Sequence, residues 1–192
     1  MDPFTIGILC AVGASGAAAA MRWGRGRRAG AEARRTPPKL ESANAQSGDE
    51  VRVGDVLTYL GDEFWLAGEL ALVREGSSAI RLFTAPERGK ERWVALPRDG
   101  RSLWVLFVDK ELAAIGWPGV EIPTGGRMLR RAEFGNAAIV PGGEGLGTWE
   151  GMGRFALFRA HDAVAVVVEG PSKDRLALVG REIPRQLVQK MG

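Results

Sequence analysis

From position 51 onward the chain consists of short apolar runs separated by Gly, Pro and Asp, and this punctuation most limits how it can fold. Short apolar runs bounded by turn residues are typical of strands. No long stretch of this region shows the roughly 3.6-residue period of an amphipathic helix. The sequence therefore predicts a mainly β domain, either an antiparallel β-sandwich or a barrel-like fold.

The predicted strands span residues 51–59, 64–74, 79–84, 92–96, 103–108, 128–134, 137–140, 154–159, 163–169 and 175–179. The tetrapeptide Arg98-Asp99-Gly100-Arg101 predicts a hairpin turn between two of them. Residues 103–108 and 163–168 are apolar without alternation, so we expect both faces of those strands to be buried. Residues 186–191, which follow Pro184, allow one short C-terminal helix or strand.

Two short motifs occur twice, in the same order. Residues 112–115 (Leu-Ala-Ala-Ile) are echoed by 176–179 (Leu-Ala-Leu-Val), and 119–123 (Gly-Val-Glu-Ile-Pro) by 180–184 (Gly-Arg-Glu-Ile-Pro). The repeated order predicts a duplicated domain with two related halves, residues 51–123 and 124–184. The alternative is coincidence between short motifs in a chain of biased composition.

Residues 3–21 carry no charge, and as a helix they would extend about 28 Å, close to the thickness of a membrane core. The sequence therefore predicts a single transmembrane helix at residues 1–22. A cleaved signal peptide is the alternative, because 17–20 are all Ala and contain a cleavage-like pattern. A signal peptide has its basic residues before the apolar run, whereas here they follow it, and this order favours the anchor.

Basic residues gather directly after the apolar run. Residues 22–39 hold seven basic side chains and one acidic one, beginning with Arg22, Arg25, Arg27 and Arg28. Basic residues remain on the cytoplasmic side, so we expect an outside N-terminus and a C-terminal domain at the cytoplasmic face of a bacterial inner membrane. The four arginines would set this topology or contact lipid headgroups. Residues 23–50 are predicted to be a basic juxtamembrane segment and a flexible linker.

The remaining domain, residues 51–192, is nearly neutral, with 19 basic and 18 acidic side chains. A nucleic-acid-binding domain would have a basic excess on its folded part, so we expect no nucleic-acid partner.

The composition argues against several kinds of chemistry. The chain has one cysteine, Cys10, and one histidine, His161, which excludes a disulfide framework and zinc sites built from several Cys or His. The Gly-rich residues 142–147 and 151–153 are followed by a predicted strand, whereas a dinucleotide site requires a helix there. We therefore expect the Gly-rich residues to form a hairpin loop and His161 to lie in a turn. We expect no catalytic, cofactor-binding or metal-binding residues.

Two groups of residues still invite functional hypotheses. Trp117 and Trp149 lie in Gly-rich loops and are candidate partner contacts, whereas Trp104 lies in a buried strand and is expected in the core. The acidic candidates for an enzyme would be Glu121, Glu182, Asp55 and Glu169. Acid–base or metal chemistry would require at least two of these carboxylates to converge in one cleft.

The domain resembles a bacterial family of unknown function, DUF4178, over roughly residues 51–183. The resemblance rests on Val53-Gly54-Asp55, Arg81-Leu82-Phe83, residues 92–96, residues 163–169 and Gly180-Arg181-Glu182-Ile183. It implies a β-rich fold and supplies no established catalytic residues.

Together these features favour a membrane-anchored, non-catalytic β domain that acts as a scaffold or protein-interaction module, with a protein partner or another copy of itself. One alternative is a domain that binds a small molecule or a lipid in a pocket between its two halves. An enzyme that depends on the carboxylates named above is a further alternative.

Overall fold

The computed structural model describes residues 50–87, 90–143 and 145–191. The first strands are β1 (Val56–Tyr59), β2 (Asp62–Trp65), β3 (Gly68–Arg74), β4 (Ser77–Thr84), β5 (Arg92–Pro97) and β6 (Ser102–Val108). Helix α1 (Lys110–Ala114), β7 (Glu121–Thr124), β8 (Arg127–Gly143) and the short 3₁₀ helix η1 (Gly147–Trp149) follow. The chain continues through β9 (Gly151–Ala160), β10 (Ala163–Glu169), β11 (Arg175–Pro184), the 3₁₀ helix η2 (Arg185–Leu187) and β12 (Gln189–Met191).

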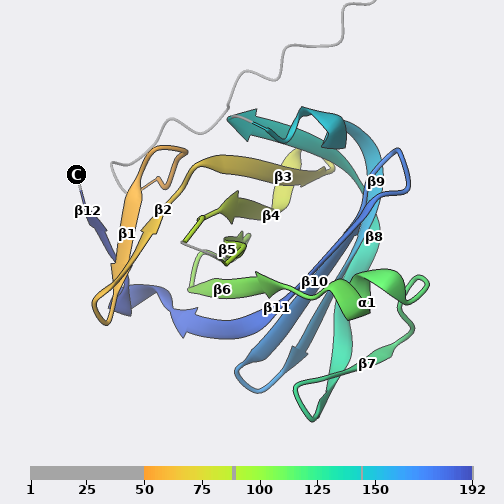
Figure 1. The fold of residues 1–192 in the computed structure, drawn as a ribbon. Helices are drawn as coiled ribbons and strands as arrows, with labels where there is room; N and C mark the ends of the chain where they lie inside the picture. Colours follow the sequence, from red (N-terminus) through yellow and green to blue (C-terminus); the bar gives the residue numbers. More distant parts are fainter. Residues whose placement is uncertain (1–49, 88–89, 144, 192) are drawn as a thin grey trace, which may run out of the picture. The chain divides into compact units, whose positions relative to one another are not determined.

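Eight of these strands close into an antiparallel barrel in the order β3-β4-β5-β6-β11-β10-β9-β8 (Figure 1). The pairing of β3 with β8, which aligns Leu72 with Ile139, joins the two ends of the sheet. Closure gives every strand of the barrel two neighbours, so the barrel itself has no free edge. The prediction of a mainly β fold is confirmed, and the structure is a barrel, not a sandwich.

The barrel interior is filled by side chains that alternate along each strand. On β6, Trp104 and Leu106 point inward, and on β10, Val164, Val166 and Val168 do the same. Ile80, Leu82, Ile139 and Phe155 pack against them from the other strands. Trp104 is fully buried, which confirms that it belongs to the core.

Two additional layers cover parts of the outer barrel surface. On one side, the three-stranded sheet β12-β1-β2 places Leu57 and Phe64 against Phe83, Val94 and Val105 of the barrel. On another side, Leu112 of α1 and Ile122 of β7 cover Ala165, Val167 and Ala177.

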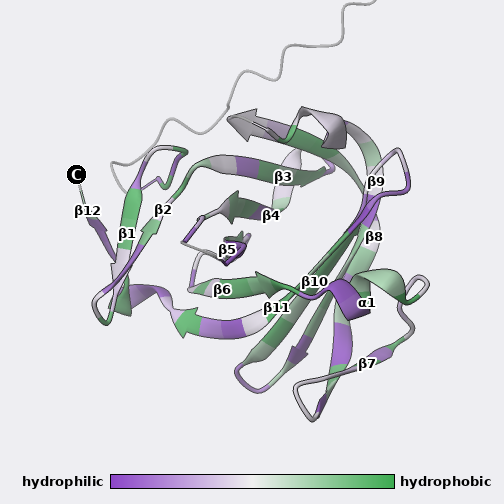
Figure 2. Cartoon of the chain, in the orientation of Figure 1, coloured by the Kyte–Doolittle hydropathy of each residue, from purple (hydrophilic) through white to green (hydrophobic). Residues whose placement is uncertain are grey.

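These covers explain why β6 and β10 are apolar without alternation: outward side chains such as Val105 and Val167 are also buried. Figure 2 shows hydrophobic residues along much of β6. The predicted burial of both faces is thus confirmed for residues 103–106 of β6 and for β10, whereas Phe107 at the end of β6 is 43% exposed.

Several predicted element boundaries are wrong. Residues 64–74 form two strands, β2 and β3, because the chain passes from the small sheet into the barrel at the buried Leu66. The segments 128–134 and 137–140 form one strand, β8, because β9 pairs through the interval between them and aligns Gly135 with Phe155.

Helix α1 and strand β7 were not predicted from the sequence. Asp109 caps α1 by accepting a 2.9 Å hydrogen bond from the backbone N–H of Leu112. The first copy of the echoed Leu-Ala motif lies largely in α1, whereas the second copy lies in β11, so the two copies differ in secondary structure. The duplication into residues 51–123 and 124–184 remains a prediction.

Two predicted turns are confirmed. Gly100, with a φ of 62°, allows the turn between β5 and β6, and its N–H donates to the carbonyl of Pro97. His161 lies in the turn between β9 and β10. The predicted transmembrane helix at 1–22, and the predicted linker apart from Glu50, lie outside the described residues. Among the residues described, no helix is long and apolar enough to cross a membrane.

Candidate interaction surface

One sector of the outer barrel surface, formed by β3, β8 from Phe134 onward and β9 near Met152, is apolar and lies under neither cover, whereas Ala156 and Phe158 farther along β9 are buried beneath the α1 segment. Along these strands, Leu72, Ile139 and Phe155 point into the barrel, and the alternate residues therefore point outward. We call the outward apolar residues the bare wall: Ala71, Val73, Phe134, Ala138, Val140 and Met152. The buried clusters of the described residues include none of these six side chains.

Strand register makes most of the bare wall continuous, with Phe134 separated from the other residues by the polar pair Asn136 and Arg154. Ala138 on β8 aligns with Val73 on β3 and with Met152 on β9, forming one row across three strands. The next row along β3 pairs Ala71 with Val140. Exposed fractions of 59% for Phe134, 64% for Met152 and 40% for Val140 leave three large apolar side chains in solvent. Contiguous exposed apolar surface of this kind marks interaction sites more often than isolated apolar residues do.

Charged residues of opposite sign lie at the two ends of the bare wall. Arg131 lies near one end, where its guanidinium stacks 4.3 Å from the centre of the Phe134 ring. Glu150 lies at the other end, directly before β9. Within the described part of the chain, neither Arg131 nor Glu150 has an ion-pair partner.

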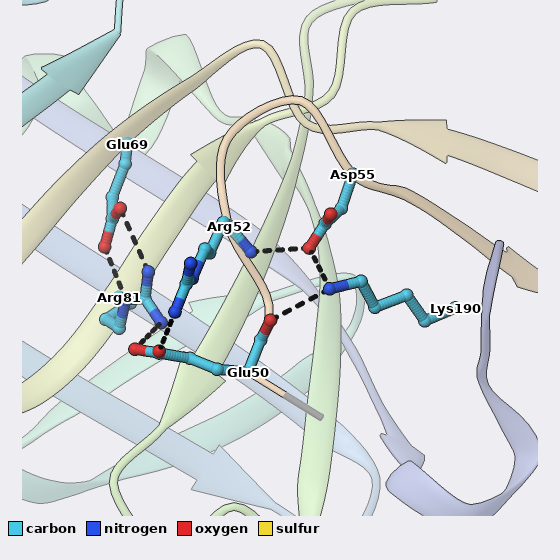
Figure 3. Close-up of polar contacts among 6 residues, drawn as sticks. All are labelled: Glu50, Arg52, Asp55, Glu69, Arg81 and Lys190. Atoms are coloured by element: carbon cyan, nitrogen blue, oxygen red, sulfur yellow. Dashed lines mark hydrogen bonds and ion pairs between the residues drawn. The ribbon is translucent and has the colours of Figure 1, made fainter. Parts of the chain in front are cut away.

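Polar contacts hold Glu50, the first described residue, beside the bare wall (Figure 3). Its carbonyl accepts a 3.0 Å hydrogen bond from Nζ of Lys190, and its carboxylate lies 4.0 Å from Nη1 of Arg81. Arg81 on β4 also binds Glu69 and aligns with Ala71 of the bare wall. The chain therefore enters the described domain at the edge of this surface.

Lys190 also binds Asp55, with 2.8 Å between Nζ and Oδ2. Burial alone would raise the pKa of Asp55, but hydrogen bonds from Lys190 and from the Arg52 backbone lower it below its ordinary value. These contacts tie the start of the described chain to its last strand, β12.

A buried ion cluster joins the barrel to the segment that contains α1. Glu169 is 4% exposed and accepts hydrogen bonds from Arg154 at 2.8 and 3.0 Å and from Arg175 at 2.9 Å. These hydrogen bonds lower the pKa of Glu169 to about 2. Arg175 also donates to the carbonyls of Ala113 and Ile115, so Glu169 positions a cation that holds the cover in place.

The two tryptophans predicted as partner contacts are both half-buried. Trp117 stacks on the Arg154 guanidinium at 4.1 Å and packs against the cluster under α1. Trp149 in η1 packs against the barrel core, close to Gly170. Their role as contacts stays a prediction. The tryptophan most exposed in the described domain is Trp65 on β2, with an exposed fraction of 55%.

Each of the four carboxylates considered for catalysis has its own basic partner. Glu121 lies 3.3 Å from Arg130, and Glu182 lies 3.7 Å from Arg159. Asp55 binds Lys190, and Glu169 binds Arg154. In the described ranges, no group of three or more His, Cys, Asp or Glu side chains is arranged to hold a metal ion.

Two small hollows lie on the domain surface. The first, of about 240 Å³, is bounded by Asp62, Phe64, Arg92, Val105, Phe107, Gly180 and Arg181. The second, of about 280 Å³, is bounded by Arg74, Glu75, Ser77, Ala79, Arg98 and Glu133. Both are smaller than the range of roughly 300–1,000 Å³ typical of small-molecule sites. The first hollow borders the outward-facing Val105, so it lies outside the filled barrel interior.

Sequence reasoning did not identify the bare wall. Residues 70–73 form an uninterrupted apolar run, which indicates a strand but does not say which of its faces receives a second layer. The signal available in the sequence was the pair of large apolar residues Phe134 and Met152. Recognising that both lie on the outer face of the barrel requires the register between β8 and β9.

The four arginines predicted to set membrane topology, Arg22, Arg25, Arg27 and Arg28, lie outside the described residues. No protein-family model, curated protein or solved structure matches the chain, and its resemblance to DUF4178 therefore stays a prediction.

Proposed function

We propose that this chain is a membrane-tethered, non-catalytic interaction module at the cytoplasmic face of a bacterial membrane. Its contact surface is the bare wall. The observation that carries the proposal is the exposure of Phe134, Val140 and Met152 on the same side of the barrel. Keeping these side chains in water is unfavourable, and a partner that covers them gains roughly 25 cal/mol for each Å² of apolar area removed from water.

The filled barrel supports surface recognition over ligand storage. Trp104, Phe155 and Val166 occupy the interior that a lipid or small molecule would need. Such a ligand would have to use a surface site such as the hollow beside Phe107, which is small and lies outside the barrel. Binding of a small molecule or lipid is therefore the second candidate, and carboxylate-dependent catalysis is the third.

The tether rests on the order of segments in the sequence. An uncharged run at 3–21 precedes seven bases within 22–39. This order favours an anchor with a cytoplasmic domain. The linker before Glu50 would let the domain move relative to the membrane while keeping it nearby.

The proposal is tested by fractionating cells that produce the full-length protein or a version beginning at Gly48. We expect only the full-length protein in the membrane fraction, with its domain protected when protease is added to spheroplasts. Recovery of a shortened, soluble and protease-exposed product would contradict the tether and support a cleaved signal peptide. Equal membrane association of both versions would also contradict it, because the tether would then lie within the domain.

A further inference from the structure

The two ends of the barrel interior are covered by different kinds of side chain. At the end where β9 begins, Leu146 and Trp149 pack against the interior cluster and cover it with apolar groups. At the end where β9 finishes, the inward position two residues after the interior Leu157 holds the charged Arg159. We call the polar residues around this second end the barrel mouth: Arg74, Ser77, Arg98, Ser102, Glu133, Arg159 and Glu182.

Strand register turns the charged residues of the barrel mouth toward the interior. Glu133 on β8 aligns with Leu157, and Glu182 on β11 aligns with Trp104. Leu157 and Trp104 both belong to the interior cluster, and aligned residues of antiparallel strands share a face of the sheet. The Arg159 guanidinium lies 4.8 Å from the centre of the Trp104 ring, so this cation covers the interior directly.

Arg74 covers the same end from β3. A Cβ added at Gly135 would lie 3.3 Å from Nη1 of Arg74 and 4.0 Å from the ring of Phe155. Phe155 is part of the interior cluster, so the missing side chain at Gly135 leaves space in which the guanidinium lies above the interior.

The hollow of about 280 Å³ opens at the barrel mouth. Arg74, Arg98 and Glu133 line it, and Ala79 in its wall packs against the interior cluster. Arg159 is the diagonal neighbour of Glu133 across β8 and β9, at a typical separation of roughly 7–8 Å, and therefore lies next to the hollow. The mouths of β-barrels are a common place for ligand sites.

The guanidinium groups at the barrel mouth are loosely held. Arg159 lies 3.7 Å from the carboxylate of Glu182, and Arg74 lies no closer than 3.8 Å to a carboxylate. These separations exceed the length of a hydrogen bond. Within residues 50–87, 90–143 and 145–191, Arg98 has no ion-pair partner. Donors at three arginines thus face the hollow or its edge with capacity for further hydrogen bonds.

Two buried polar groups at this end also lack partners. Neither Nε1 of Trp104 nor Oγ of Ser102 has a hydrogen-bond partner in the described part of the chain. Trp104 is fully buried and Ser102 is 5% exposed. Leu103, which lies between them, packs in the outer cluster, so both side chains face the interior. An indole N–H can only donate, and it therefore requires an acceptor.

We propose that the barrel mouth binds a small anion with several oxygens, such as a phosphate or a dicarboxylate. Guanidinium groups match the planar oxygens of such anions, and the hollow has room for a small group of this kind. Bound oxygens also bring an acceptor toward Trp104 Nε1, directly or through a bridging water. This site is additional to the bare wall and requires neither the tether nor a protein partner.

The carboxylates at the barrel mouth limit the affinity. A bound anion competes with Glu133 and Glu182 for the same arginines, so we expect a Kd on the order of 1 mM. A phosphate can belong to a free small molecule or to a lipid headgroup, and the experiment distinguishes these two sources.

Nuclear magnetic resonance of the indole N–H groups tests the site. The full-length protein, purified in a neutral detergent, is titrated with inorganic phosphate and with malonate, and Trp104→Phe identifies the Trp104 signal among the six tryptophans. We expect the Trp104 signal to shift saturably with at least one of the two anions. No saturable shift of this signal up to about 20 mM of either anion would overturn the proposal.

Arginine substitutions locate the binding. Arg74→Gln, Arg98→Gln and Arg159→Gln should each raise the Kd by about fivefold or more, because each removes charge-assisted hydrogen bonds. The matched control is Arg131→Gln on β8, since Arg131 aligns with the outward-facing Phe158 and lies outside the mouth. An equal increase for Arg131→Gln would overturn the proposal, because it would indicate a general effect of charge. Dispersed indole signals in each variant confirm that it is folded.

Short-chain lipids identify the source of the anion. Dihexanoylphosphatidylglycerol and its phosphatidylcholine counterpart are titrated as monomers under the same conditions. Binding of the phosphatidylglycerol that Arg98→Gln weakens would support the site and assign a lipid headgroup, whereas binding of inorganic phosphate or malonate alone would support it and assign a free anion. Equal binding of the phosphatidylcholine would overturn the proposal, because acyl chains would then be the recognised group.

Discussion

The covered and bare sectors of the barrel surface have the same apolar character but different surroundings. Outward residues such as Val105 on β6 and Val167 on β10 are buried under a second layer. Outward residues such as Phe134 on β8 and Met152 on β9 remain exposed. An apolar outer wall is thus used in two ways, to hold additional elements of the same chain and to present a surface to another molecule.

This difference predicts which positions control stability and which control association. Replacing a residue under a cover removes both the burial of that side chain and its packing against the covering layer. A residue on the bare wall has few contacts to lose within the chain, so its replacement should leave folding almost unchanged. The following predictions proceed from the largest expected effect to the smallest.

Val167→Asp should have the largest effect, lowering the free energy of unfolding by about 4 kcal/mol or more, because it buries an unpaired charge between barrel and cover. Met152→Asp makes a similar change on the bare wall and should alter stability by less than about 0.5 kcal/mol. Urea unfolding followed by circular dichroism measures both. Equal decreases in the free energy of unfolding would show that the bare wall is buried. They would contradict the distinction between the covered and bare sectors.

Glu169→Gln should lower stability by about 3 kcal/mol, since it leaves Arg154 and Arg175 without their shared anion at the junction with the α1 cover. Glu150→Gln is the control, because Glu150 has no ion-pair partner in the part of the chain that the structure describes. Thermal unfolding of the two variants would separate them. Equal midpoints would mean that the buried cluster adds no net stability.

Gly180→Ala should lower stability by about 2 kcal/mol, because overpacking forces β11 away from β6. A Cβ at this position would collide with the carbonyl oxygen of Val105, a residue that lies under the three-stranded sheet. Gly116→Ala is the control, since a Cβ there would meet nothing within 4 Å. Urea unfolding midpoints test the difference, and a neutral Gly180→Ala would contradict the close approach of these strands.

Acidification should remove the contribution of Glu169 gradually. Its pKa falls from an ordinary 4.5 to about 2 on folding, so its stabilisation is complete above pH 4.5 and is lost as the pH falls toward 2. By pH 4 the loss should be roughly 1 kcal/mol. Unfolding at pH 7, 5 and 4 should show a smaller decrease for Glu169→Gln than for the unchanged protein. Parallel decreases would assign the acid sensitivity to other groups.

Much of the barrel could be predicted from local pattern. Residues 103–108 and 163–168 are uninterrupted apolar runs, and the burial of most of their side chains on both faces follows from that composition. The hairpin turn at Asp99-Gly100 could be predicted for a similar reason, because glycine adopts the positive φ that the turn needs. Helix α1 could not be predicted, because five residues are too few to show a helical period.

The candidate site could be predicted only in part. The sequence identified Asp55, Glu121, Glu169 and Glu182 as carboxylates of interest, but their partners Lys190, Arg130, Arg154 and Arg159 come from other strands. Trp117 and Trp149 were chosen for their Gly-rich surroundings, and long-range packing against the outer and inner clusters half-buries both. Contacts between residues far apart in sequence depend on strand order, which local pattern does not contain.

Local pattern is enough to predict apolar strands separated by turns from residue 51 onward, since side-chain chemistry and glycine geometry act locally. It also contains the uncharged run and the arginines from which the tether is proposed. The pairing of β3 with β8, which closes the barrel and leaves Phe134, Val140 and Met152 on its outside, is visible only in the folded chain. The physical reason is that alternation divides a strand into two faces, but closure and covering layers determine which of those faces meet water.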